Sequence, residues 1–263
     1  MTDNMAKLID THAHLQFKAY DADRDEVVKR NSEELAAVIN VGTSIDASEK
    51  AIQLAKKVSN FYASVAIHPH HVDQWNDETF QRLETLAKTE KVVAVGEIGL
   101  DVHHYENYPK PNLTTQTKIL HQQIGIAQKL KLPVILHCRD AYGQLYKEIK
   151  PNRGKISGVV HCFMGTWEQA KKFLDLGFYI SFTGNLTYKG NGTLREIAKK
   201  VPDERILTET DAPYLPPEPH RGERNEPIYV KMVASTLASI KNWSLEESAK
   251  ITTNNAKNLF KIS

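Results

Sequence analysis

The stretch LIDTHAHL, residues 8–15, is the first of eight short apolar runs that recur along the chain. Each run contains a handful of residues rich in Val, Ile and Leu, a pattern that is typical of buried parallel strands. We therefore expect each run to form one strand. The other seven are LAAVINVG (35–42), YASVAIHPH (62–70), VVAVGEIGLD (92–101), PVILHCRD (133–140), SGVVHCF (157–163), FYISFTGNL (178–186) and RILTETDAPYL (205–215).

Segments with a helical spacing of apolar residues lie between most of these runs. In residues 113–131, for example, Leu120, Ile124 and Ala127 recur at spacings of four and three. Several segments open on Asp, Thr or Ser, which favour the N-termini of helices. We expect helices at 46–59, 77–88, 113–131, 166–177, 192–201, 226–240 and 244–260.

This alternation decides the fold class. Eight strands joined by mostly helical connections predict an α/β protein with a single (β/α)8 barrel of the TIM type. The alternative is an open doubly wound sheet, but no glycine-rich phosphate loop follows any of the runs. The chain has 263 residues and no internal repeat, low-complexity tract or linker. A barrel of about 250 residues forms one unit, so we expect one domain over residues 1–263.

Composition excludes several functional classes. The 34 basic and 32 acidic residues nearly balance, which argues against a broad basic surface for nucleic acid. Two cysteines do not make a disulfide framework and indicate a reducing compartment. No apolar run approaches the roughly 20 residues of a membrane span, and MTDNMAKLID (1–10) lacks the pattern of a signal peptide. We therefore expect a cytoplasmic protein with no membrane partner.

Histidines and carboxylates gather where the predicted strands end. The carboxyl ends of the strands in a parallel barrel surround one mouth, where the active site lies. Glu97 lies inside an apolar run, and a buried carboxylate is costly unless it is paired or binds an ion. Imidazoles and carboxylates together predict a divalent-metal site at this mouth. The residues at the strand ends are His12, His14, His68, His70, Glu97, Asp101, His137, Arg139, Asp140, His161, Glu209 and Asp211.

Side-chain alternation predicts which of these residues point the same way. Residues two apart in a strand share a face, so His12 and His14 should lie together. The same spacing relates Glu209 and Asp211. Such a pair lets one strand offer two ligands to one ion.

The same alternation places the residues beside the strand histidines. Arg139 shares the face of His137 and should sit at the mouth, where it either grips a phosphate bidentately or forms a structural salt bridge. Cys138 and Cys162 each follow a strand histidine directly, so we expect both thiols to face the helices.

Two aromatic residues near the predicted mouth leave two interpretations open. Phe163 and Tyr214 could each stack on bases of a nucleic acid. Each could equally fill space beside the metal site.

The motifs at the strand ends, taken together, resemble a known family. The matching stretches run in order from near residue 8 to the C-terminal helices: IDTHAHL (9–15), AIHPH (66–70), VGEIGLD (95–101), PVILHCRDA (133–141), HCF (161–163), ISFTGNLTYK (180–189), LTETDAPYLPP (207–217) and HRGERNEP (220–227). This set resembles the TatD family of metal-dependent nucleases within the amidohydrolase superfamily. Many amidohydrolases bridge their metals with a carbamylated lysine, and Glu97 at the end of the fourth strand favours the TatD-like branch.

The resemblance implies a role for each matching residue. It implies two divalent cations per subunit, Zn, Mn or Mg, with Glu97 bridging them. Asp211 would also contact the attacking water, and Glu209 would serve the catalytic site or a third ion. His68 would hold the substrate phosphate, with Arg139 as a further substrate contact. The implied metal ligands are His12, His14, Glu97, His137, His161 and Asp211, and the catalytic candidates are Asp211, Glu97 and Glu209.

These residues together predict a metal-dependent hydrolase. The favoured function is a TatD-like deoxyribonuclease that cleaves phosphodiester bonds of single-stranded or fragmented DNA, or of RNA, with a water activated by two metals. The resemblance implies 3′-to-5′ exonuclease activity. The alternative is a metal-dependent esterase or amidohydrolase such as a D-aminoacyl-tRNA deacylase. A non-catalytic nucleic-acid-binding module would predict an incomplete ligand set, whereas this chain has every member.

Overall fold

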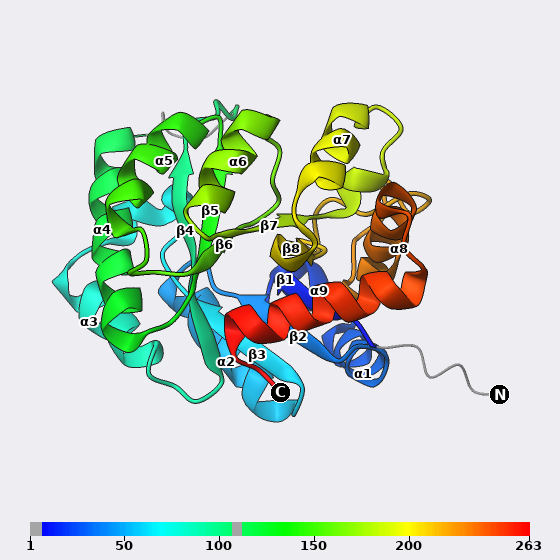
Figure 1. Ribbon diagram of the computed structural model, residues 1–263. Helices are drawn as coiled ribbons and strands as arrows, with labels where there is room; N and C mark the ends of the chain where they lie inside the picture. The colour runs from blue at the N-terminus through cyan, green and yellow to red at the C-terminus, as the bar shows by residue number, and fades with distance from the viewer. Residues whose placement is uncertain (1–6, 107–111) are drawn as a thin grey trace.

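The strands close into a barrel surrounded by helices (Figure 1). The computed structural model describes residues 7–106 and 112–263. The prediction that residues 1–10 are not a signal peptide therefore falls partly outside the described residues. All neighbouring strands pair in parallel in the order β1 to β8, which confirms the (β/α)8 barrel against the open sheet. The strands are β1 (Ile9–Ala13), β2 (Ala37–Val41), β3 (Phe61–Val65), β4 (Val92–Asp101), β5 (Val134–Arg139), β6 (Gly158–Val160), β7 (Tyr179–Phe182) and β8 (Ile206–Thr208).

The helices follow the predicted ranges to within a few residues. Side chains cap several of them, as at Ser44, which accepts a hydrogen bond from the Ala47 amide. Two helices, α1 (Arg24–Glu34) and α5 (Tyr142–Ile149), were not singled out from the sequence. The others are α2 (Ile45–Lys57), α3 (Asp77–Leu86), α4 (Leu113–Leu130), α6 (Trp167–Asp175), α7 (Gly192–Lys200), α8 (Val230–Lys241) and α9 (Leu245–Phe260), with short 3-10 turns η1 (Lys18–Tyr20), η2 (Pro69–Gln74), η3 (Lys150–Asn152), η4 (Gly184–Thr187), η5 (Asp203–Arg205) and η6 (Pro227–Tyr229).

The barrel closes between β1 and the segment that follows β8. Ala13 and Ala212 form a parallel bridge. The amide of His14 donates to the carbonyl of Ala212 at 2.8 Å, and the amide of Asp211 donates to the carbonyl of His12 at 2.8 Å. The closure therefore brings together residues that lie about 200 positions apart in the chain and that belong to the predicted metal site.

Apolar side chains fill the barrel at the end where the strands begin. Ile9, Ile39 and Leu207 are buried there against Leu259 and Phe260 of α9. Figure 1 shows α9 in red across this end of the strands. α9 covers the end where the strands begin, and the histidines and carboxylates of the predicted site lie at the other end. A separate apolar layer lies between the strands and the outer helices.

An irregularity in β4 adjusts the position of its carboxylate. Gly96 pairs with Ile135 and Ile98 pairs with Leu136, so Glu97 is an extra residue in the register. Such bulges commonly redirect side chains next to active sites. Nearby, a Cβ at Gly99 would lie 1.9 Å from the backbone oxygen of His137 on β5. Only glycine therefore lets β4 and β5 come this close at that point.

The two cysteines are free, as predicted, but only one lies where it was expected. Cys138 is buried in the layer against the helices, where burial raises its pKa to about 12. Cys162 departs from the prediction, because it follows β6 with a φ of 45° and strand alternation no longer applies. Its sulfur lies 3.7 Å from the Thr183 hydroxyl. Burial, and then the charges of Asp211 and Glu209, raise its pKa well above the usual value.

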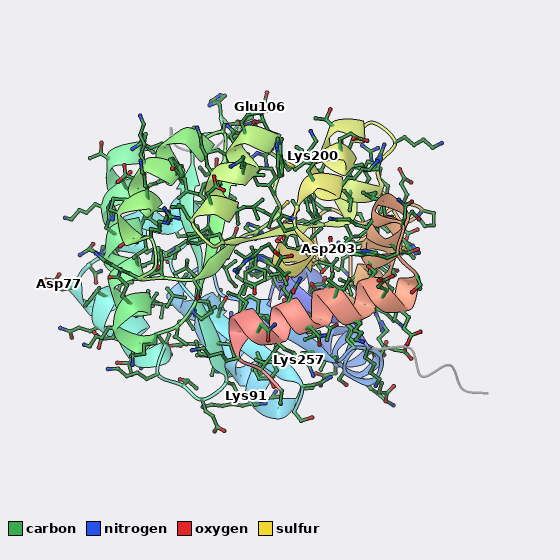
Figure 2. The ribbon with its side chains drawn as sticks, viewed as in Figure 1. Asp77, Lys91, Glu106, Lys200, Asp203 and Lys257 are labelled. Carbon is green, nitrogen blue, oxygen red and sulfur yellow. The ribbon has the colours of Figure 1, made fainter. Side chains whose placement is uncertain are left out.

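The outer surface is rich in charged side chains. Asp77 and Glu106 lie at the edge of the molecule in Figure 2. In the described parts of the chain, no helix is both long enough and apolar enough to cross a membrane.

Candidate metal centre

Four ligand atoms converge at the closure of the barrel. The Nε2 atoms of His12 and His14 lie 3.2 Å apart. Glu97 Oε2 lies 3.4 Å from the first ring nitrogen and 3.9 Å from the second. Asp211 Oδ1 lies 3.6 Å and 3.4 Å from the same two atoms. Atoms that share one ion at about 2.1 Å with tetrahedral angles lie about 3.4 Å apart. His12, His14 and Glu97 could therefore hold one cation, and Asp211 lies at a similar distance from the same two histidines.

A second set of ligand atoms surrounds the other oxygen of Glu97. Its Oε1 lies 2.7 Å from His137 Nδ1 and 2.6 Å from His161 Nε2. These two ring nitrogens are 3.3 Å apart. His68 Nε2 lies 3.6 Å from the same carboxylate oxygen. One buried carboxylate thus faces two separate groups of histidines, as a bridging ligand would.

Partners on the far side of the imidazole rings orient their free nitrogens. His14 Nδ1 lies 2.8 Å from the carbonyl of Val41, so Nδ1 carries the proton and Nε2 is left as an electron-pair donor. His137 Nε2 lies 3.1 Å from Asp101 Oδ2, which leaves Nδ1 to face Glu97. These two rings therefore present His14 Nε2 and His137 Nδ1 to the carboxylates of the site.

His68 has the opposite arrangement. Its Nδ1 accepts a hydrogen bond from the amide of His70 at 3.1 Å, so in the neutral ring the proton lies on Nε2. Burial lowers the pKa of His68 to about 4, and the ring is neutral near pH 7. His68 with Glu97 and His137 could also hold an ion by proximity alone. However, an Nε2–H that points into the mouth suits an anionic oxygen better than a cation.

Asp101 is a site residue for which no role was predicted. Its Oδ2 lies 2.8 Å from His70 Nε2 and 3.1 Å from His137 Nε2, and the Tyr105 hydroxyl donates to it at 3.0 Å. Although burial opposes ionisation, hydrogen bonds from His137 and His70 lower the pKa of this carboxyl. The signal was available, because Asp101 ends the same apolar run as Glu97.

The site concentrates carboxylate charge among imidazoles. Burial disfavours ionised Glu97, but His161 and the neighbouring rings outweigh this and lower its pKa well below the usual value. In the same way His14 and His12 overcome burial and lower the pKa of Asp211. For His161, burial is outweighed by Glu97, and its pKa rises. The ionised carboxylates make the mouth attractive to cations.

Comparison with known proteins agrees with this geometry. The sequence pattern of the family described as TatD related DNase matches residues 9–261. The chain belongs to the TatD family. It is 38% identical over 257 residues to YabD of Bacillus subtilis, described as an uncharacterized metal-dependent hydrolase, covering 97% of this chain and 99% of that protein. It is 34% identical over 263 residues to the 3′-5′ ssDNA/RNA exonuclease TatD of Cronobacter sakazakii, covering 96% and 97%.

Solved structures of TatD proteins share this barrel. YJJV, a TatD homologue from Escherichia coli, superposes with a TM-score of 0.90 at 30% identity, covering 98% of this chain and 99% of that one. An organophosphorus hydrolase from Deinococcus radiodurans superposes with a TM-score of 0.64 at 11% identity, which shows a shared fold. As a member of the TatD family the chain is a metal-dependent hydrolase.

Glu209 supports the histidines of this TatD site from behind. Its Oε1 accepts from the amide of Cys162 at 2.7 Å, and its Oε2 accepts from the Ser181 hydroxyl at 2.7 Å. His161 Nδ1 lies 3.4 Å from Oε1. β8 ends before Glu209, so strand alternation does not extend to Asp211, which lies against His12 and His14 instead. Glu209 with His12 and His161 forms a third cluster that could hold an ion.

Asp10 is a second buried carboxylate that the TatD motif contains and that sequence reasoning missed. Its Oδ1 accepts from the amides of Thr210 and His12 at 2.9 Å and 3.2 Å. Its Oδ2 accepts from the Thr210 hydroxyl at 2.6 Å. It therefore holds β1 against the segment that carries Asp211, the last of the predicted ligands. The signal in the sequence was an acidic residue inside the apolar run 8–15.

The predicted substrate contacts are less uniform. Arg139 is half-buried, and its guanidinium carbon lies 5.2 Å from the centre of the Tyr105 ring. Phe163 is 1% exposed and fills space in the core, which excludes base stacking. Tyr214 is 54% exposed at the surface.

Proposed function

We propose that this chain is a nuclease that hydrolyses phosphodiester bonds of single-stranded DNA or RNA with two divalent cations. The observation that carries the proposal is the position of Glu97, whose two oxygens face two different sets of ligand atoms. Relatives named 3′-5′ ssDNA/RNA exonuclease support the choice of substrate and of polarity. The proposal includes the single-domain organisation over residues 1–263 and the cytoplasmic location expected from the sequence.

In this proposal each ligand residue would bind one of two ions, and one residue would bind both. His12, His14 and Asp211 would hold the first ion, His137 and His161 the second, and Glu97 both. Imidazole and carboxylate donors suit Zn²⁺ and Mn²⁺, and Mg²⁺ less well. When bound, such ions would lower the pKa of water and stabilise negative charge on the phosphate.

The protein's own groups would position the reactants. The Asp211 side chain is 15% exposed, so its carboxylate can reach the attacking water and accept its proton. His68 donates through Nε2–H to a non-bridging phosphate oxygen. Arg139 adds positive charge on the side of Tyr105. Asp101 and Glu209 keep the rings of His137 and His161 in place.

The test is an assay on end-labelled single strands with Mn²⁺, Zn²⁺ or Mg²⁺ and with a chelator, together with metal analysis. We expect a ladder of products, two ions per chain and loss of cleavage on chelation. Glu97→Gln should lose both ions, whereas Glu90→Gln, exposed before the start of β4, should match the parent. No cleavage with any of these ions would contradict the proposal. Hydrolysis of acylated tRNA without cleavage of the strand would support the esterase alternative instead.

A further inference from the structure

A pocket lies beside the segments that follow β1 and β8. Its volume is about 440 Å³, and residues that follow β1, β2, β3 and β8 line it. Phe17, Lys18, Thr43 and Tyr214 are among these residues. Pockets for small-molecule groups typically measure about 300–1,000 Å³. The predicted metal ligands do not line this pocket.

Aromatic rings connect the pocket to the metal centre. The Phe17 ring stacks on the His14 ring, with centres 4.5 Å apart and planes at 8°. The Tyr214 ring lies 6.5 Å from Phe17 at 72° and 6.4 Å from His14 at 69°. The wall of the pocket is therefore continuous with a predicted metal ligand, and a group seated in it would lie next to the reacting phosphate.

The chemistry of the wall suits a nucleobase. Tyr214 is one of two large apolar side chains that are exposed in the described residues, the other being Met164. Aromatic side chains beside positive charge are the surfaces on which single-stranded nucleic acids stack their bases. Lys18 is exposed on η1 directly after Phe17 and supplies that charge. Lys50, also on the wall, is already paired with Asp46 at 2.8 Å.

We propose that Phe17 and Tyr214 form a subsite for the base of a nucleotide next to the scissile phosphate, with Lys18 beside its backbone. The inference rests on the proposed nuclease function, because a strand whose phosphate lies at His14 passes over the neighbouring Phe17. The ligand is a nucleobase of a single strand. Stacking, rather than hydrogen bonding to base edges, would make the subsite tolerant of sequence.

The test couples a protein change to a substrate change. Short single strands carry one abasic position, moved in turn through the nucleotides nearest the labelled 3′ end. For the parent protein, the abasic position that faces the subsite should lower kcat/KM about tenfold or more. For Tyr214→Ala and for Phe17→Ala, the same abasic strand should be cleaved within about twofold of the intact strand. Phe17→Trp should restore the penalty.

Several outcomes separate this inference from the proposed function. Met164→Ala, which removes the other exposed apolar side chain, should keep the full abasic penalty of the parent. Cleavage with equal abasic penalties in the parent and in both alanine variants overturns the subsite and leaves the nuclease intact. Absence of cleavage by the parent overturns both. Because Phe17 packs on His14, Tyr214→Ala at the surface decides the question if Phe17→Ala fails to fold.

Discussion

Glu97 shows how single side chains determine what this barrel mouth can bind. A carboxylate that is 4% exposed inside an apolar strand is costly unless cations or hydrogen-bond donors surround it. Here His12, His137 and His161 all lie within 3.4 Å of one of its oxygens. The sequence predicted the need for such partners. The ring nitrogen that each histidine presents depends on atoms behind the rings, such as the carbonyl of Val41, which no sequence pattern identifies.

Asp211→Asn should abolish most of the nuclease activity while the protein stays folded. The amide keeps the shape of the side chain but cannot accept the proton of the attacking water, so kcat should fall by about 100-fold to 10,000-fold. Cleavage rates at saturating metal and thermal melting of both proteins check this. Asp140→Asn is the matched control. Asp140 also comes after a strand and has the same φ of 57°, and its side chain is 62% exposed. An Asp211→Asn protein that cleaves at the parent rate would exclude Asp211 from the mechanism.

His68→Ala should weaken catalysis without loss of metal. The Nε2–H of His68 is assigned to the phosphate, so its removal should lower kcat/KM by about 100-fold. Metal analysis should still find the parent content of ions. His121→Ala, which removes an exposed histidine on α4, should change neither value. Loss of one ion per chain in the His68 variant would instead make His68 a ligand.

At the scale of elements, close contacts between β4 and β5 hold two of the predicted ligands. Glu97 occupies the irregularity in β4, and His137 lies opposite Gly99 on β5. The strands can approach in this way because no side chain intervenes at Gly99. The positions of two predicted ligands therefore depend on a residue that has no side chain.

Gly99→Ala should destabilise the protein, whereas Gly125→Ala should not. The new methyl group at Gly99 would meet the backbone of β5, and such overpacking typically costs about 1–3 kcal/mol. Gly125 lies on the exposed face of α4, and a Cβ there would meet no atom of another segment within 4 Å. Alanine at this position should therefore stabilise the helix by about 0.5–1 kcal/mol. Denaturant unfolding of the two variants checks the opposite signs. Equal effects at both positions would contradict the contact.

At the scale of the whole molecule, the start and the end of the barrel are tied together at several levels. Asp10 joins β1 to Thr210 in the core. Nearer the surface, Arg224 donates to both carboxylate oxygens of Asp23 at 2.7 Å and 2.6 Å. These contacts join segments about 200 residues apart and keep Asp211 beside His12.

Asp23→Asn should destabilise the protein in a pH-dependent way. Hydrogen bonds from Arg224 lower the pKa of Asp23 below its usual value of 3.8. A lowered pKa stabilises the folded state above the pKa of the unfolded chain, and this contribution is lost as pH falls through the folded-state pKa. The variant should therefore melt a few degrees below the parent at pH 7, and the difference should shrink as the pH falls below about 4.

Melting curves across this pH range measure the effect. Asp25→Asn, which changes an exposed acid two residues further along in the first turn of α1, is the control and should follow the parent at every pH. A difference between Asp23→Asn and the parent that is the same at low and at neutral pH would show that the ion pair is not its cause.

The sequence by itself determined the order of the strands and of most helices, because apolar periodicity and caps are local properties. It also determined which residue types meet at the mouth, since strand ends in a parallel barrel share one edge. Only the tertiary structure decided which of those side chains lie together and which atoms they present to one another. It placed Glu97 between two sets of histidines, turned His68 into a donor, and brought Cys162 toward the carboxylates. It also made Phe17 and Tyr214 neighbours. These outcomes depend on register shifts, left-handed residues after strand ends and contacts about 200 residues apart, none of which leaves a local pattern.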